Sequence, residues 1–160
     1  MQGFEHSIEF LRLQIFGPIA ERLILSVFLG GVIGLERQFR HKAAGLRTNM
    51  LICFGSAMFT VISVQMAEKF GGDQTRIAAQ IIAGIGFLGA GAIIHSQQGS
   101  VVGLTSAATI FVTAAVGMAA GAGLYFTAIF ATVVVLLALV GLGKLEDYFE
   151  RKHIPKCPPA

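Results

Sequence analysis

The sequence predicts an all-α integral membrane protein, a bundle of about five transmembrane helices preceded by a short interfacial helix. Of the 160 residues, 54% are hydrophobic and only 13% are charged, and the mean hydropathy is +0.73. A soluble domain usually carries roughly 25% charged residues, so this chain is expected to face lipid. The 20 glycines favour helices that pack closely in a membrane. We expect no soluble enzyme domain.

The first segment, residues 1–18, is expected to lie along the membrane surface. Charged residues interrupt the apolar residues between Phe4 and Phe16, and the stretch is too short and too polar to cross a bilayer. Gly17 and Pro18 then predict a helix break. We therefore expect an interfacial amphipathic helix ahead of a transmembrane domain at 19–143.

Five stretches approach the roughly 20 apolar residues that a helix needs to cross a bilayer. The last two form a nearly continuous apolar run, in which Gly121-Ala122-Gly123 predicts a tight turn. The predicted spans are 19–36, 47–67, 76–95, 104–120 and 124–143, followed by a charged tail at 144–160.

Lysine and arginine are distributed unequally between the two sides of the predicted bundle. The loop after the first span and the tail hold Arg37, Arg40, Lys42, Arg47, Lys144, Arg151, Lys152 and Lys156, whereas the other side holds Arg12, Arg22, Lys69 and Arg76. The richer side should be cytoplasmic, which places the N-terminus outside and the C-terminus inside. We therefore attribute the net charge of +3 to the excess of cations that orients a protein in the membrane. No nucleic acid is expected as a partner.

Small residues indicate where helices approach one another. Ala79, Ala83, Gly86 and Ala90 share one face of the third span. The same span contains a G-x-G-x-x-G pattern at 84–89, but a dinucleotide site needs a preceding strand, so we interpret the glycines as packing residues. The other glycines assigned to helix packing are Gly30, Gly34, Gly117 and Gly121.

The fourth span carries hydroxyl groups at regular spacing. Thr105, Thr109 and Thr113 lie four residues apart, so they follow one line along a helix. Each threonine could bond the carbonyl four residues earlier. Alternatively, Thr109 and Thr113 could form a polar seam with Gln80 that lines a pore. Both interpretations stay open.

The loop after the first span carries the strongest chemistry. Arg47 begins a helix, where the dipole opposes a cation, so it should have an anionic partner, and Glu36 is the nearest candidate. A clamp between two helices and an anion-binding surface both fit this pair. The topology gathers a polar cluster at the cytoplasmic helix ends, namely Glu36, Arg37, Arg47, Thr48, Asn49, His95 and Thr105.

Residues on the outer side and at the centres of the spans narrow the functions that the sequence allows. Asp73 can cap the third span, where Arg76 meets an unfavourable dipole, and Gln80 lies one turn deeper. No span carries a charge at its centre, which argues against a high-turnover ion pump. The sequence has no catalytic constellation and no metal-ligand spacing, so we expect no enzyme, no metal site and no cofactor.

Four separate pieces resemble the membrane domain of the MgtC/SapB family. They lie in the same order as in the family and cover roughly 20–145. The pieces are Gly34-Leu35-Glu36-Arg37, Ala44-Gly45-Leu46-Arg47-Thr48, the run 78–91, and Gly103-Leu104-Thr105-Ser106-Ala107-Ala108-Thr109.

The resemblance implies a bacterial inner-membrane regulator that acts in adaptation to low magnesium or acid stress and in virulence. Other membrane proteins are the implied partners, among them ATP synthase and ion or phosphate transport components, besides membrane lipids. The alternative is a small homo-oligomeric transporter or channel for Mg²⁺ or H⁺. Asn49 stands where histidine is common in the family. Since the sequence ends at Ala160, we expect the membrane domain alone.

Overall fold

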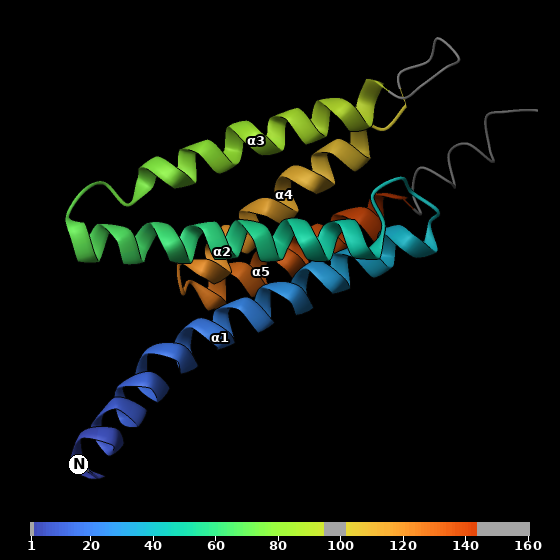
Figure 1. The fold of residues 1–160 in the computed structure, drawn as a ribbon. Coiled ribbons are helices and arrows are strands. Elements are labelled where there is room, and N and C mark those ends of the chain that lie inside the picture. Colours follow the sequence, from blue (N-terminus) through green and yellow to red (C-terminus); the bar gives the residue numbers. More distant parts are fainter. Residues whose placement is uncertain (1, 95–101, 144–160) are drawn as a thin grey trace, which may run out of the picture.

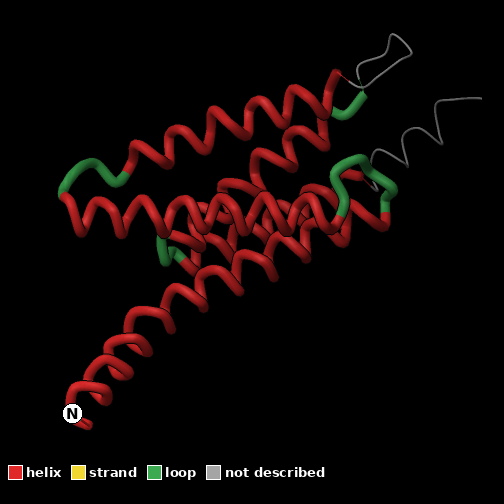
Figure 2. Tube along the Cα trace, viewed as in Figure 1, coloured by secondary structure: helices red, strands yellow, loops and turns green. Residues whose placement is uncertain are grey.

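The structure, a computed structural model, describes residues 2–94 and 102–143, with side chains at 17–93 and 102–143. Within these ranges every element is helical and the connections are short (Figure 2). The helices are α1 (Gln2–Phe39), α2 (Leu46–Phe70), α3 (Thr75–Ile94), α4 (Leu104–Gly121), α5 (Tyr125–Leu137) and the π-helix η1 (Ala138–Leu142).

The predicted fold class is confirmed. Five helices in the described part of the chain are long and apolar enough to cross a membrane. Their spans are Gly17–Phe39, Leu46–Phe70, Thr75–Ile93, Leu104–Gly121 and Tyr125–Leu142. The predicted site residue His95 and the predicted tail 144–160 lie outside the described residues.

The helix break predicted at Gly17 and Pro18 is wrong, because α1 continues through both residues as one 38-residue helix. Proline removes one backbone hydrogen bond, but its fixed φ near −65° is itself helical. The remaining hydrogen bonds on both sides can therefore keep the helix continuous. The surface location of residues 1–18 stays a prediction.

Helix α4 is the centre of the bundle, because it contacts α1, α2, α3 and α5. Helices α1 and α2 form the most extensive pair and run antiparallel on one side of it. Helix α3 follows α2 in sequence but packs more extensively against α4 than against α2. Figure 1 shows α3 diverging from α2 along its length. The bundle is thus closed around α1, α2 and α4 and open between α2 and α3.

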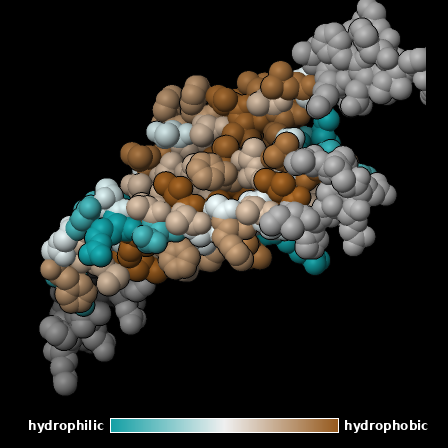
Figure 3. All heavy atoms as spheres, turned by 90° about the horizontal axis from the view of Figure 1, so that it is seen from above, coloured by the Kyte–Doolittle hydropathy of each residue, from teal (hydrophilic) through white to brown (hydrophobic). Residues whose placement is uncertain are grey.

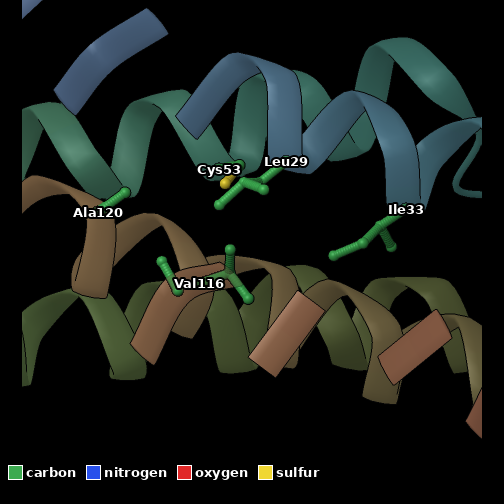
Figure 4. Packing of buried hydrophobic residues seen from close by; sticks show 6 residues of the cluster. Leu29, Ile33, Cys53, Val116 and Ala120 are labelled. Atoms are coloured by element: carbon green, nitrogen blue, oxygen red, sulfur yellow. The ribbon is translucent and has the colours of Figure 1, made fainter. Parts of the chain in front are cut away.

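The main apolar core lies where α1, α2, α4 and α5 meet (Figure 4). It contains Leu29, Ile33, Cys53, Val116, Ala120 and Ala128, each at most 5% exposed. A second cluster joins α3 to α4 and consists of Ala44, Ile81, Ile85, Ile110 and Ala114. The core therefore uses small side chains at α4, which lets four helices approach one another.

Glycine sets the distances between the closely packed helices. A Cβ at Gly30 of α1 would lie 2.6 Å from the Cβ of Cys53, and one at Gly34 would lie 2.8 Å from the Cα of Leu46. On α4, a Cβ at Gly117 would collide with the backbone carbonyl of Cys53. Gly121 makes the same kind of approach to the carbonyl of Ala57. A larger residue at these positions would have to push whole helices apart.

Apolar side chains also dominate the outside of the bundle. Seen from the side of α3, they cover the middle of the surface, and hydrophilic side chains gather towards its two ends (Figure 3). Exposed examples are Phe28, Phe59, Phe87 and Phe126. An exposed apolar belt between polar ends is the surface that a bilayer requires, so the protein is a multi-pass membrane protein.

Candidate functional site

A groove of about 960 Å³ opens between α2 and α3. We call it the α2–α3 groove. Its walls come from α2 between Arg47 and Phe59 and from α3 between Ile77 and Ala92, and Ile110 of α4 contributes from the bundle interior. The walls are mostly apolar. Arg47 and Thr48 line the groove at the end of the bundle where the α1–α2 loop lies.

The opposite face of α3 carries the predicted stripe of small residues. Two residues rotate a helix by about 200°, so Ala79 does not line the groove beside Ile77. It borders a second cavity near the α2–α3 turn, which Phe70 of α2 also lines. Together with Ala79, the exposed residues Ala83, Gly86 and Ala90 form what we call the small-residue face. A Cβ at Gly86 would meet no atom within 4 Å. No described helix covers this face.

Glu36, Arg37 and Arg40 form a compact group of ion pairs at the end of α1, which we call the ion-pair group. Glu36 Oε2 accepts from Arg37 Nε at 2.5 Å, and Glu36 Oε1 lies 2.9 Å from Arg40 Nε. Arg37 is 2% exposed and Glu36 11%. A Cβ at Gly143, which follows η1, would lie 2.6 Å from the guanidinium of Arg40. The guanidinium of Arg40 therefore lies directly against Gly143, at the end of the last described helix.

The predicted pair between Arg47 and Glu36 is not formed. Glu36 is occupied by Arg37 and by Arg40, which lies one helical turn further, directly after the end of α1, and is therefore the nearer partner. Arg47 and Thr48 are exposed on the groove side of α2. Among the described residues, no carboxylate forms an ion pair with Arg47.

Asn49 lies on the other side of α2 and is fully buried. Its Nδ2 donates to the carbonyls of Ala44 at 2.8 Å and Gly45 at 2.9 Å, which fixes the α1–α2 loop. Its Oδ1 accepts from Thr113 Oγ1 at 3.1 Å. This bond joins α2 to α4, and no sequence pattern indicates that these two residues pair.

Of the two buried threonines of α4, one makes the predicted bond to its own helix and the other bonds a neighbouring helix. Thr109 donates to the carbonyl of Thr105, four residues earlier, at 2.7 Å, whereas Thr113 bonds Asn49 across helices. Both Thr109 and Thr113 are buried against neighbouring helices, and Thr105 is exposed. Gln80 lies apart from them, exposed on α3 at the α2–α3 groove. The structure therefore does not bring Gln80, Thr109 and Thr113 together along one passage.

Polar contacts at the opposite end fix the helix ends. Asp73 Oδ1 accepts from the backbone N–H and the hydroxyl of Thr75 at 2.8 and 2.7 Å, at the start of α3. These two hydrogen bonds hold the pKa of Asp73 below its usual value, and the bond from the hydroxyl of Thr75 has the larger effect. Arg76 is exposed and adds a weaker attraction. Arg22 donates to the carbonyl of Gly121 at 3.2 Å, where a cation suits the helix dipole.

Two arginines with a role in this geometry were missing from the predicted site. Arg40 lies four residues after Glu36, and a carboxylate and a cation at that spacing commonly form an ion pair. The sequence could therefore have predicted this pair. Arg22 had no such sign, because its partner is a backbone carbonyl 99 residues away. Within the described ranges, no three His, Cys, Asp or Glu residues lie close enough to hold a metal ion.

Comparison with known proteins places the chain in a family. The MgtC family model matches residues 23–148. "Protein MgtC" of Brucella abortus (strain 2308) is 54% identical over 122 residues, which cover 76% of this chain and 50% of the relative. "Putative magnesium transporter YhiD" of Escherichia coli (strain K12) is 49% identical over 124 residues, covering 74% of this chain and 57% of that protein.

A third relative, an "Uncharacterized protein" of Haemophilus influenzae, is 42% identical over 141 residues, covering 84% of this chain and 59% of the relative. The chain thus spans little more than half the length of these relatives. No solved structure matches it. The family match begins within the first span, continues to the end of the fifth, and includes the ion-pair group, the groove and the small-residue face. The chain belongs to the MgtC family.

Proposed function

We propose that the chain is a regulatory protein of the bacterial inner membrane that binds another membrane protein through the small-residue face of α3. Its N-terminus lies outside and its C-terminus in the cytoplasm, and it performs no enzymatic reaction. The process that it regulates is adaptation to low magnesium or acid stress. The observation that carries this proposal is the exposure of Ala79, Ala83, Gly86 and Ala90 on one helix face.

Small residues matter in lipid because they let the backbone of a second helix come close. Association between membrane helices depends on such packing, since lipid tails are as apolar as the side chains. Within this chain the same device is used where Gly30, Gly34, Gly117 and Gly121 meet neighbouring helices. The small-residue face offers an equivalent surface with no described neighbour, so a helix of another protein can complete it.

The proposal is tested by crosslinking in native membranes followed by recovery of the tagged chain. Gly86→Leu places a bulky side chain in the centre of the small-residue face. Overpacking costs about 1–3 kcal/mol, so the yield of the crosslinked partner should fall roughly tenfold. Gly84→Leu is the matched control, because residue 84 lies on the groove side of the same helix. Equal partner yields from wild type and Gly86→Leu would refute the proposal.

A second candidate is transport, which the name of the Escherichia coli relative favours. We propose as the alternative a homo-oligomer that conducts Mg²⁺ or H⁺ between copies of the chain. Flux into liposomes separates the two functions. Transport requires Mg²⁺ or H⁺ flux above that of empty liposomes, whereas a regulator leaves the flux at the background.

A further inference from the structure

Arg47 is a cation in an unfavourable position. It lies in the first turn of α2, where the helix dipole opposes a positive charge. Glu36, its expected partner, is held by Arg37 and Arg40, and no other described carboxylate forms an ion pair with Arg47. An anion that does not belong to the described fold would therefore be stabilised beside it.

The α2–α3 groove begins at this cation. Arg47 is the one charged side chain among the residues that line the groove, and most of the wall consists of apolar side chains such as Leu51, Phe59 and Leu88. The complementary ligand has one anionic end and a long apolar part. Its anionic end would meet Arg47 and Thr48, and its apolar part would lie between α2 and α3.

The length and charge of the groove fit a lipid. From Arg47 to Phe59 the α2 wall is about 18 Å long, close to one leaflet of a hydrocarbon core roughly 30 Å thick. An acyl chain of one leaflet can therefore follow the apolar wall while its headgroup lies beside the single cation at the end of the groove.

We propose that the α2–α3 groove binds an anionic phospholipid, with the phosphate at Arg47 and Thr48 and one acyl chain between the two helices. The proposed orientation of the chain makes this a lipid of the cytoplasmic leaflet. Because no acidic residue lies in the first turn of α2, the phosphate also meets no repulsion there. The site lies on the opposite side of α3 from the small-residue face, so it is independent of the proposed partner.

Glycines along the groove make the proposal testable without disturbing the helices. A Cβ at Gly55, Gly84 or Gly91 would meet no atom within 4 Å. A leucine at position 84 therefore projects into the groove and occupies the space of the acyl chain. Gly86→Leu places the same side chain on the other face of α3 and serves as its control.

The experiment counts the lipids that the full chain retains in native mass spectrometry. The protein in detergent is given palmitoyl-oleoyl phosphatidylglycerol or, in a second sample, phosphatidylcholine with the same acyl chains. One arginine at a membrane surface contributes enough attraction for about a fivefold preference for the anionic lipid. The wild type should show this preference, and Arg47→Gln should lose it.

Lys42→Gln is the matched charge control, because Lys42 is an exposed cation of the neighbouring α1–α2 loop that does not line the groove. It should keep the preference. Gly84→Leu should reduce retention of both lipids, and Gly86→Leu should leave it unchanged. Equal losses from Lys42→Gln and Arg47→Gln, or unchanged retention in Gly84→Leu, would overturn the site. A Gly84→Leu variant that loses dimer mass instead of lipid would assign the groove to a second copy.

Discussion

On the side that faces α1 and α4, helix α2 lies so close to its neighbours that Gly34 and Gly117 leave no room for a methyl group. On the side that faces α3, Gly55 and Gly84 border open space. The two sides also differ in their polar groups. Asn49 is fully buried and hydrogen-bonded on the closed side, whereas Arg47, two residues earlier, is exposed at the groove.

This difference separates residues that hold the bundle together from residues that are available to bind. On the closed side, small residues and hydrogen bonds bring helices into direct contact, and a change there should alter stability. On the open side, the same residue types have no partner among the described residues, and a change there should alter binding. Matched substitutions on the two sides should therefore differ in what they change.

The largest expected effect concerns the ion-pair group. Glu36→Gln removes the carboxylate and leaves Arg37, which is 2% exposed, without its counter-charge. Breaking a buried pair in this way costs about 3 kcal/mol or more of the free energy of unfolding. Arg47→Gln, on the open side, should change it by less than about 0.5 kcal/mol. Unfolding by increasing amounts of sodium dodecyl sulfate measures the free energy of unfolding of both variants. Comparable losses of stability would contradict the difference between the closed and the open side of α2.

A smaller effect is expected at the glycine contacts. Gly117→Ala puts a Cβ against the carbonyl of Cys53, and such overpacking costs about 1–3 kcal/mol. Gly86→Ala adds the same atom where nothing lies within 4 Å, so its unfolding free energy should stay within about 0.5 kcal/mol of wild type. If the two alanine variants unfold alike, the close α2–α4 approach is incorrect.

The hydrogen bond between Thr113 and Asn49 should contribute less. Interhelical hydrogen bonds in membranes average about 0.6 kcal/mol and reach about 1.7 kcal/mol, and Thr113→Val should cost an amount in that range. Thr109→Val is the control and should be nearly neutral, because Thr109 bonds a carbonyl of its own helix. In a double-mutant cycle, Thr113→Val and Asn49→Ala should show coupling. Additive effects would show that the bond is absent in the membrane.

The smallest effect is expected at Asp73, which is fully exposed. Its pKa is lower in the folded state, so its contribution is present above the usual value of 3.8 and is lost as pH falls through the folded value. Wild type should therefore be more stable than Asp73→Asn at about pH 6, and the difference should shrink as the pH falls below 3.8 and through the folded-state pKa. A difference that persists in acid would mean that the carboxylate charge is not its cause.

The sequence predicted the five-helix fold because lipid imposes long apolar segments that composition alone identifies. It predicted less of the site. Arg47 and Asn49 lie in the same first turn of α2, and only the packing of α2 determines that Asn49 faces α4 while Arg47 faces the groove. Glycine presents the same difficulty, since Gly117 and Gly86 are equivalent in sequence and differ only in whether another helix lies opposite.

The positions of the residues suggested to line a pore were hard to predict for a related reason. Thr109 and Thr113 share a helix face by spacing, but a polar face can meet either water or another helix. The buried side chain of Asn49 on α2 supplies the partner for Thr113, and no local pattern around either residue indicates this. The expected pair of Glu36 with Arg47 is not formed because Arg40, which directly follows α1, is the nearer cation.

The central claim is that α3 has two binding faces of different kinds. Photo-crosslinking in native membranes with benzoylphenylalanine at position 86 or position 84 tests it directly. Position 86, on the small-residue face, should give an adduct with another protein, and position 84, in the α2–α3 groove, should give an adduct with lipid. A protein adduct from position 84, or none from position 86, would contradict the account.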